Sequence, residues 1–363
     1  MENKSDVKQA EEKPQKCAFI GKKYFFKQGK YAINPKSIGL PISLIVLIYN
    51  FVHMSYFMSK FLSSSSFAIL LIINIILFTM QILQSLNTAL TDPGSYLPNY
   101  WEDKSNNSDA KIMLATIKGQ EYFLKFCRTC LIAKDLRVYH CPDCGLCILR
   151  HDHHCPWLSN CIGLNNHHLF FYLVIINVVY FVFNFFIILH IVLNLNDYEI
   201  EELLSKNDKV FAYVLLVLNI FLLLFNFALL IVHIIYMITG QTTNEKVKRK
   251  RGAINPFSND SKKQNAIEFW KCPMRYRERI EYNDAAKKYL DTNILICDYL
   301  SGSYYMSPDK KIISETLVNK GYSYSTANIE LIDKSSEGGE TSDTVKLDEQ
   351  NINNGNGNAA IAQ

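Results

Sequence analysis

The placement of apolar residues constrains this sequence of 363 residues more than any other feature. Four long stretches, at residues 38–58, 67–87, 169–193 and 210–238, consist mainly of apolar side chains. A helix needs roughly 20 such residues to cross the hydrocarbon core of a bilayer. Helices and closed barrels are the structures that satisfy their backbone hydrogen bonds there. The sequence therefore predicts an all-α polytopic membrane protein with four transmembrane helices.

Charges in the connecting segments predict the orientation of these helices. Residues 1–37 carry nine lysines, and residues 246–251 hold five basic residues in six. Residues 194–209 carry five acidic residues against two lysines. Because basic loops stay on the cytosolic side of a membrane, both termini and residues 88–168 are expected in the cytosol. The membrane itself is expected to be an endomembrane (Golgi or ER) or the plasma membrane.

The remaining segments differ in composition. Residues 1–37 read as a solvated basic tail, and residues 194–209 as a lumenal or extracellular loop. Residues 239–333 are mixed and are expected to form a cytosolic region. Residues 334–363 are rich in Ser, Gly, Asn and acidic residues, which predicts disorder. The net charge of +4 is small and gives no reason to expect a nucleic-acid partner.

The cytosolic segment between the second and third spans concentrates the cysteines. Residues 127–161 hold seven of the ten cysteines and four of the nine histidines. Cys-x-x-Cys pairs with histidines at this spacing are typical of zinc ligands, and a reducing cytosol disfavours disulfides. Two closed tetrahedral sites use eight of these eleven side chains and leave three. Spacing alone does not decide how the eight are divided.

The run Asp152, His153 and Cys155 contains the elements of an activated nucleophile. A neighbouring imidazole can take the proton of a thiol, and a carboxylate on the far ring nitrogen fixes the tautomer and stabilises the imidazolium. On spacing alone, Cys155 could equally be a ninth metal ligand and His153 a surface residue. Cys155 precedes the third span by about 14 residues, which places it near the cytosolic face of the membrane.

The sequence Asp152-His153-His154-Cys155 within this cysteine pattern resembles the DHHC family of membrane-bound protein S-acyltransferases (palmitoyltransferases). The resemblance covers residues 127–163. Outside it, Asp92-Pro93-Gly94 and Thr242-Thr243-Asn244-Glu245 match two shorter motifs of the family. The element Asn255-Pro256-Phe257, with Asn265 and Phe269, resembles its aromatic and asparagine element after the fourth span.

This resemblance implies an activity and a set of metal ligands. The enzyme would transfer a long-chain acyl group, such as palmitoyl, from acyl-CoA to cysteines of membrane-associated proteins. It would work in two steps through an acyl-Cys155 intermediate, with His153 and Asp152 assisting. Two structural Zn²⁺ ions would be held by two interleaved sets of ligands. These are Cys127, Cys130, His140 and Cys147 for one site, and Cys141, Cys144, His154 and Cys161 for the other.

The resemblance also implies further contacts. Thr242, Thr243 and Glu245 would support the site from the end of the fourth span. Trp157 and Tyr180 would line an acyl-chain cavity, although ordinary packing near a membrane interface is the alternative. Lys134 and Arg137 could face the CoA phosphates or be solvated. The sequence departs from the family at Lys134-Asp135 and at His167-His168, which affects the acyl and CoA contacts.

Two alternatives remain open. A non-catalytic zinc-binding membrane scaffold would use the same metal ligands, although the intact Asp152, His153 and Cys155 argue against it. Polar residues also recur at intervals of seven within the predicted spans, and they could be packing contacts between helices or a polar pathway. They are Asn74 and Gln81, Asn177 and Asn184, and Asn219, Asn226 and His233.

Overall fold

The structure is a computed structural model. It describes residues 18–27, 29–61, 64–96, 113–130, 132–195, 205–249, 255–271 and 278–290. The predicted disordered tail at 334–363 lies outside these residues, as do residues 196–204 of the predicted loop and residues 291–333 of the predicted C-terminal region.

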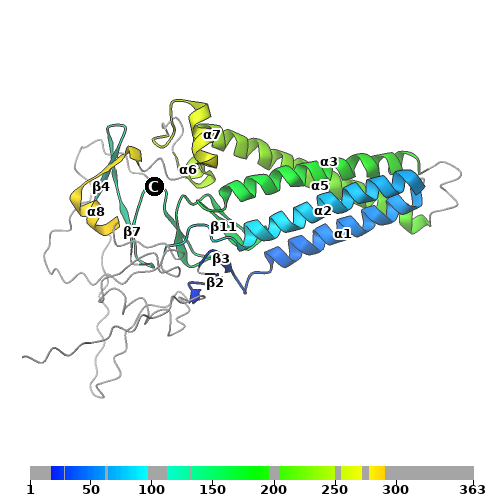
Figure 1. Cartoon of the computed structure of the whole chain (residues 1–363), viewed down its shortest axis with the longest axis horizontal. Helices are drawn as coiled ribbons and strands as arrows, with labels where there is room; N and C mark the ends of the chain where they lie inside the picture. Colours follow the sequence, from blue (N-terminus) through cyan, green and yellow to red (C-terminus); the bar gives the residue numbers. More distant parts are fainter. Residues whose placement is uncertain are drawn as a thin grey trace, which may run out of the picture.

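Four long helices form a bundle, namely α1 (Gly39–Phe61), α2 (Ser64–Leu90), α3 (His167–Leu193) and α5 (Lys206–Thr239). Helix α3 packs between α2 and α5, and α1 packs against α2 (Figure 1). Each helix is long and apolar enough to cross a membrane. The predicted all-α membrane fold with four spans is therefore confirmed, and the chain is an integral membrane protein.

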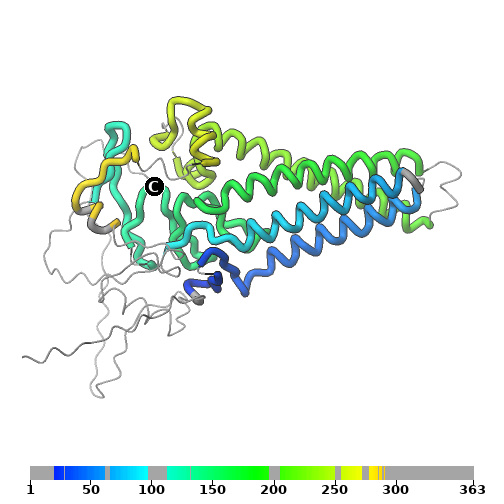
Figure 2. Tube along the Cα trace, viewed as in Figure 1, coloured from blue at the N-terminus to red at the C-terminus, as the bar shows by residue number. Residues whose placement is uncertain are grey.

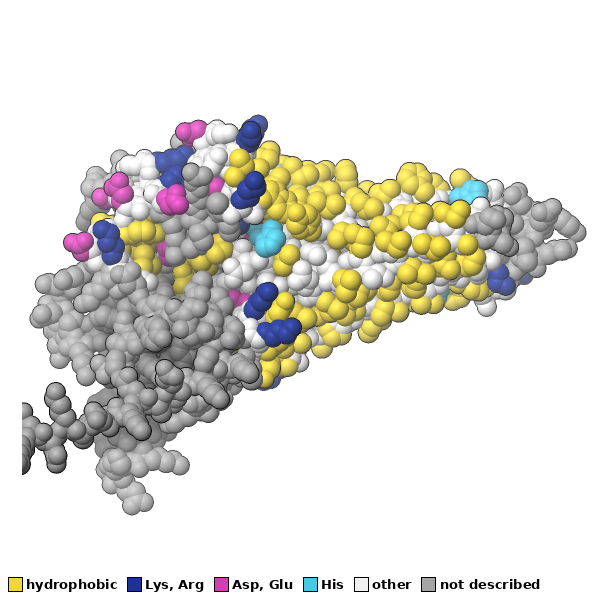
Figure 3. Space-filling view, in the orientation of Figure 1, with side chains coloured by type: hydrophobic (Ala, Val, Ile, Leu, Met, Phe, Trp, Pro, Cys, Tyr) yellow, Lys and Arg dark blue, Asp and Glu magenta, His cyan; other side chains and the backbone are white. Residues whose placement is uncertain are grey.

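The surface of the bundle agrees with this assignment. Apolar side chains cover the bundle along its length. Basic and acidic side chains gather at the end of the bundle where the cysteine-rich region lies (Figure 3). Inside the bundle, Gln81 donates to Asn177 at 3.0 Å, and Asn177 donates to Asn226 at 2.9 Å. These bonds join α2, α3 and α5, so Gln81, Asn177 and Asn226 act as contacts between helices.

The cysteine-rich region consists of short antiparallel hairpins, which the sequence analysis did not predict. Their strands are β6 (Lys125–Cys127) with β7 (Ile132–Lys134), β8 (Tyr139–Cys141) with β9 (Leu146–Ile148), and β10 (His153–Cys155) with β11 (Asn160–Ile162). The 3-10 turn η1 (Pro156–Leu158) joins the last pair. Together with its metal-ligand groups, this region is called the zinc domain below.

Further segments complete the end of the molecule that carries the zinc domain. Some lie between α2 and α3 in the chain, and others follow α5. Strands β4 (Leu114–Ile117), β5 (Gln120–Phe123) and β12 (Ile280–Tyr282) form a sheet in the order β12-β4-β5. Helices α6 (Thr243–Lys248), α7 (Lys262–Trp270) and α8 (Asp284–Leu290) follow α5 in the chain. Asn265 donates to the Ile238 carbonyl at 3.0 Å and so caps the C-terminal end of α5.

The N-terminal segment differs from the expected solvated tail. Strands β1 (Ala18–Ile20), β2 (Lys23–Phe26) and β3 (Tyr31–Ile33) form an antiparallel meander. Its buried side chains, Phe25 among them, pack against residues of the zinc domain, and Figure 2 shows this first segment lying beside that domain. The prediction of a solvated tail is therefore wrong for residues 18–33. It was based on lysine content, which does not show that these strands have an apolar face.

Candidate active site

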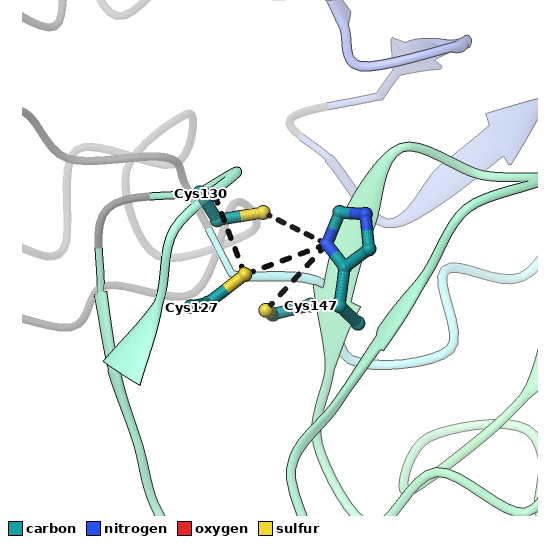
Figure 4. A group of neighbouring side chains, drawn as sticks. Cys127, Cys130 and Cys147 are labelled. Carbon is teal, nitrogen blue, oxygen red and sulfur yellow. Dashed lines mark hydrogen bonds between the residues drawn. The ribbon is translucent and has the colours of Figure 1, made fainter. Parts of the chain in front are cut away.

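The strand register of two hairpins divides the metal ligands into two groups. In β8 and β9, His140 lies opposite Cys147. Because side chains alternate along a strand, Cys141 points to the other face from His140. Cys127 and Cys130 complete the first group. Their thiols and that of Cys147 converge on the Nδ1 atom of His140 (Figure 4). Neighbours in sequence therefore belong to different groups.

The second group is built on the hairpin of β10 and β11. There His154 lies opposite Cys161, and these two side chains meet Cys141 and Cys144. The three thiols lie 3.5–3.6 Å from the His154 Nδ1 atom. The two groups are the sets that the family resemblance implied.

The geometry of both groups fits zinc. With Zn–S near 2.3 Å and Zn–N near 2.0–2.1 Å, a tetrahedral ion separates sulfur from nitrogen by about 3.6 Å. In the first group the separations from His140 Nδ1 are 3.6 Å to Cys127, 3.3 Å to Cys130 and 3.9 Å to Cys147. Each group has four protein ligands and no open position, which is the pattern of a structural site.

The same alternation places the candidate nucleophile away from the metal ligands. On β10, His153 and Cys155 share one face, while His154 points to the opposite face. The His153 imidazole lies near enough to the Cys155 thiol for the two groups to interact, and its Nδ1 atom lies 2.7 Å from Asp152 Oδ2. Asp152 is thus hydrogen-bonded to His153, and His153 lies beside Cys155, with all three residues outside both metal groups.

The Asp152 carboxylate is held by α6. Its Oδ1 atom accepts from the Thr243 backbone N–H at 2.7 Å, and its Oδ2 atom accepts from the Thr243 hydroxyl at 2.8 Å. The Asn244 N–H also donates to the Asp152 carbonyl at 3.1 Å. Thr243 was expected to support the site, and these contacts give the physical means by which it can do so.

The electrostatics of Asp152 and His153 favour an ion pair between these two side chains. Burial opposes ionisation of Asp152, but the His167 and His153 imidazoles outweigh it and hold the pKa of Asp152 well below its usual range. Burial likewise lowers the pKa of His153, but its interactions with Asp152 and Cys155 raise the net pKa to about 9. Asp152 is therefore ionised near neutral pH and stabilises a protonated His153.

The turn after Cys155 is fixed against α1. The Leu40 N–H donates to Ser159 Oγ at 2.9 Å, and the Ser43 hydroxyl donates to the Trp157 carbonyl at 2.9 Å. Gly39 approaches the Pro156 carbonyl so closely that an added Cβ would lie 1.6 Å from its oxygen. A side chain at Gly39 would therefore push this turn away from the bundle.

Cys155 consequently lies where the zinc domain meets the membrane helices. It is buried in an apolar cluster with Ala89 of α2, with Phe170, Leu173 and Val174 of α3, and with two residues of its own hairpin. Leu40 of α1 and two leucines of α5 pack against this cluster. All four membrane helices therefore contribute apolar side chains around the nucleophile.

Glu245 and Arg137 form a buried ion pair that joins α6 to the zinc domain. Arg137 Nε lies 2.5 Å from Glu245 Oε1, and its Nη2 atom lies 3.0 Å from Oε2. The Glu245 side chain also accepts from the Thr242 N–H, while the Thr242 hydroxyl accepts from the Glu245 N–H, which makes a capping box. This placement favours a structural role for Arg137 over the expected contact with CoA phosphates, which stays a prediction.

The other expected ligand contacts lie in different surroundings. Lys134 is half-buried on β7 opposite Lys125. Burial, together with the charges of Lys134 and Lys125, lowers the pKa of Lys248, so three lysines gather here. Trp157 is 54% exposed beside the start of α1, and Tyr180 is fully buried inside the bundle.

Lys23 is a residue of this region that the sequence did not indicate. Its side chain is fully buried, and its Nζ atom donates to Asn160 Oδ1. Burial alone would lower the pKa of Lys23, but Cys144, Cys161 and Asp92 raise it. The Asn160 amide in turn donates to the Ala89 carbonyl at 2.8 Å. Lys23 thus offsets the negative charge of the second thiolate group and helps to fix the hairpin of Cys155.

Three further histidines, His151, His167 and His233, lie near the site but outside the two metal groups. His151 Nε2 lies 3.6 Å from Cys161 Sγ, next to the second group. His167 and His233 lie beside Asp152. The pairing of His233 with a residue 81 positions earlier depends on how α5 returns to the zinc domain, so spacing could not reveal it.

Comparison with known proteins agrees with this geometry. Residues 120–250 match the family model described as DHHC palmitoyltransferase. Over these residues the chain is similar to the DHHC palmitoyltransferase family. One relative is Palmitoyltransferase ZDHHC5 of Homo sapiens, which is 34% identical over 197 residues. That alignment covers 52% of this chain but 26% of the human protein.

Two further DHHC relatives widen the comparison. Palmitoyltransferase ZDHHC8B of Danio rerio is 30% identical over 175 residues, covering 46% of this chain and 22% of that protein. Probable protein S-acyltransferase 6 of Arabidopsis thaliana is 28% identical over 248 residues, covering 63% of this chain and 60% of that protein. The chain therefore spans about a quarter of the length of the ZDHHC relatives it matches.

Proposed function

We propose that this chain is a protein S-acyltransferase. It transfers a long-chain acyl group, palmitoyl in the first place, from acyl-CoA to cysteine thiols of membrane-associated proteins. The observation that carries the proposal is that the Asp152 carboxylate is hydrogen-bonded to His153 beside Cys155, outside both metal groups and against the ends of all four membrane helices. Its similarity to the DHHC palmitoyltransferase family supports the same activity.

The first step would acylate Cys155. With Nδ1 engaged by Asp152, the Nε2 atom of His153 holds the proton taken from the Cys155 thiol, and the resulting thiolate attacks the thioester carbonyl of acyl-CoA. The new bond joins Cys155 Sγ to the acyl carbon, and the bond from that carbon to the CoA sulfur breaks. The CoA thiolate leaves and can receive the proton from His153.

The second step would repeat this chemistry with a protein substrate. His153 takes the proton of a substrate cysteine, whose thiolate attacks the acyl-Cys155 thioester. The acyl group moves to the substrate, and the Cys155 thiolate leaves and is reprotonated. A covalent intermediate of this kind predicts ping-pong kinetics.

The surroundings of Cys155 suit such substrates. Its apolar cluster at the helix ends can receive an acyl chain from the membrane side. The three lysines at positions 125, 134 and 248 carry the charge that phosphate groups of CoA require. With both termini and the zinc domain in the cytosol, as the loop charges predict, acyl-CoA and cytosolic cysteines would reach the same face.

The two metal groups would hold zinc, which would fix the hairpins rather than take part in a step. Cys127, Cys130, His140 and Cys147 would bind one ion, and Cys141, Cys144, His154 and Cys161 would bind the other. Bound zinc would supply folding free energy to this region. The orientation of His153 and Cys155 on β10 depends on it, because His154 lies between them on the same strand.

Labelling of Cys155 tests the proposal. Purified protein incubated with labelled palmitoyl-CoA should form an adduct that neutral hydroxylamine removes. Cys155→Ser should lose the adduct and the transfer to substrate while keeping about two zinc ions per chain, whereas Cys297→Ser should behave as wild type. A Cys155→Ser protein that loses one zinc would identify Cys155 as a metal ligand. Absence of any adduct on wild-type protein would favour the scaffold alternative.

A further inference from the structure

A buried carboxylate and two imidazoles form a third group of ligand atoms beside the active site. Asp152, His167 and His233 each offer one atom, and these atoms lie within 4.8 Å of one another. His167 begins α3, and His233 lies in the last two turns of α5. All three residues are buried. The group contains none of the cysteine ligands.

The separations match those around one metal ion. His167 Nε2 lies 3.4 Å from His233 Nδ1 and 3.8 Å from Asp152 Oδ1. Two imidazole nitrogens bound to one tetrahedral zinc ion at 2.0–2.1 Å are about 3.3–3.4 Å apart. A hydrogen bond between the same two nitrogens is the alternative, and it predicts a different zinc stoichiometry.

Hydrogen bonding within the described residues does not satisfy this group. His167 Nδ1 is buried and has no hydrogen-bond partner among them, and the ring packs edge-to-face against Phe269 at 4.9 Å. The His167 nitrogen that faces His233 and Asp152 is Nε2, so a cation held by this group would bind Nε2 and leave Nδ1 as the protonated nitrogen of the ring.

The two oxygens of the Asp152 carboxylate have different partners, so a cation could bind one oxygen without displacing the partners of the other. Asp152 Oδ2 is engaged by His153 and by the Thr243 hydroxyl. Oδ1 accepts the Thr243 N–H and is the atom nearest to His167. An ion at Oδ1 would leave the hydrogen bond to His153 in place while placing a positive charge beside the active site.

We propose that Asp152, His167 and His233 bind a third divalent transition-metal ion, Zn²⁺ in the first place, and that this ion inhibits acyl transfer. Two imidazoles and one carboxylate suit zinc, whereas Mg²⁺ and Ca²⁺ take oxygen ligands. The ion binds the carboxylate that is hydrogen-bonded to His153, so it draws on the negative charge that holds this imidazole beside Cys155. The inhibitory part rests on the proposed acyltransfer function, while the metal site does not.

The test measures bound metal and activity on the same zinc-loaded, full-length protein. The protein is equilibrated with Zn²⁺ buffered over a range of free concentrations, bound zinc is counted by mass spectrometry, and the initial rate of acylation by palmitoyl-CoA is recorded. We expect bound zinc to rise from about two to about three per chain. The acylation rate should fall with the same midpoint and recover when a weak chelator removes the third ion.

Three variants assign the ion to this group. His233→Gln should stay at two zinc ions, and its inhibition midpoint should rise at least about tenfold, since even losing a partner of a metal ligand costs 10–100-fold in affinity. The matched control His168→Gln changes a neighbouring histidine outside the group and should bind and respond as wild type. Cys155→Ser should still bind the third ion, which separates this site from direct binding to the nucleophile.

Several results would overturn the proposal. If wild-type protein stays at two zinc ions, His167 and His233 form only a hydrogen-bonded pair and the proposed site does not exist. A third ion that persists in His233→Gln, or disappears in Cys155→Ser, lies elsewhere. If His233→Gln does not fold, Co²⁺ bound as the third ion to wild-type protein should show d–d absorption without a thiolate charge-transfer band, and the appearance of that band contradicts the site. A third ion bound by a protein that forms no acyl adduct would refute the proposed function alone.

Discussion

Replacing Thr243 by valine isolates one hydrogen bond to the Asp152 carboxylate. Valine matches threonine in shape but lacks the hydroxyl that donates to Asp152 Oδ2 at 2.8 Å. The backbone N–H of residue 243 still donates to Oδ1. The variant therefore leaves α6 and most of its contacts in place while removing one of the two side-chain donors to Oδ2, the other being His153.

The size of the effect follows from the charge on the acceptor. A hydrogen bond to an ionised group contributes about 1.5–3 kcal/mol, and about 1.4 kcal/mol corresponds to a tenfold change in rate. The rate changes only by the amount by which this hydrogen bond is stronger in the transition state than in the resting site. Because the backbone N–H remains, we expect the lower end, a fall of about tenfold in the acylation rate of Cys155.

The assay is a single-turnover measurement of Cys155 acylation at saturating palmitoyl-CoA. Thr243→Ser, which keeps the hydroxyl, is the matched control and should retain a rate near wild type. An unchanged rate in Thr243→Val would mean that the hydroxyl does not orient Asp152. Equal losses in both variants would point instead to movement of α6, since each would then act through lost packing.

Three other changes test separate parts of the structure. Glu245→Ala leaves Arg137 buried without its carboxylate, which costs about 3–5 kcal/mol, so a lowered Tm and reduced turnover are expected; an unchanged Tm would mean that Arg137 is neutralised elsewhere. Tyr180→Ala should raise the ratio of 18- to 16-carbon acyl-CoA used for acylation of Cys155 severalfold, because it removes a fully buried ring near Asn50; an unchanged ratio in active protein assigns chain length to another residue. Stripping zinc with a strong chelator should abolish acylation and expose the zinc domain to protease while far-UV circular dichroism retains the helices; protease resistance without metal would contradict a structural role.

The sequence predicted those features that depend on local spacing. Apolar runs of sufficient length predict spans because the bilayer imposes a minimum length on each helix. The Cys and His pattern indicated metal sites, and the resemblance implied their division. The strand register supplies the reason for that division, since His140 and Cys141 are neighbours on opposite faces of β8.

Features that depend on distant pairing could not be predicted in the same way. Lys23 looked like one more lysine of a solvated tail, and its burial beside the second thiolate group requires β2 to pack on the zinc domain. Arg137 looked like a free cation until Glu245, 108 residues later, was placed beside it. Charge and propensity describe a residue alone, whereas these roles belong to pairs brought together by the bundle.

The hydrogen bonds between Asp152 and Thr243 have a consequence for how the protein is made. The two residues are 91 positions apart, with α3 and α5 between them in the chain. At 5–20 residues per second, synthesis of this interval takes roughly 5–20 s. During that time the nascent chain already carries Cys155 but not the donors that hold Asp152. The Thr243 donors therefore reach Asp152 only after α5 has been made, so the site that we propose for acylation is completed late in synthesis.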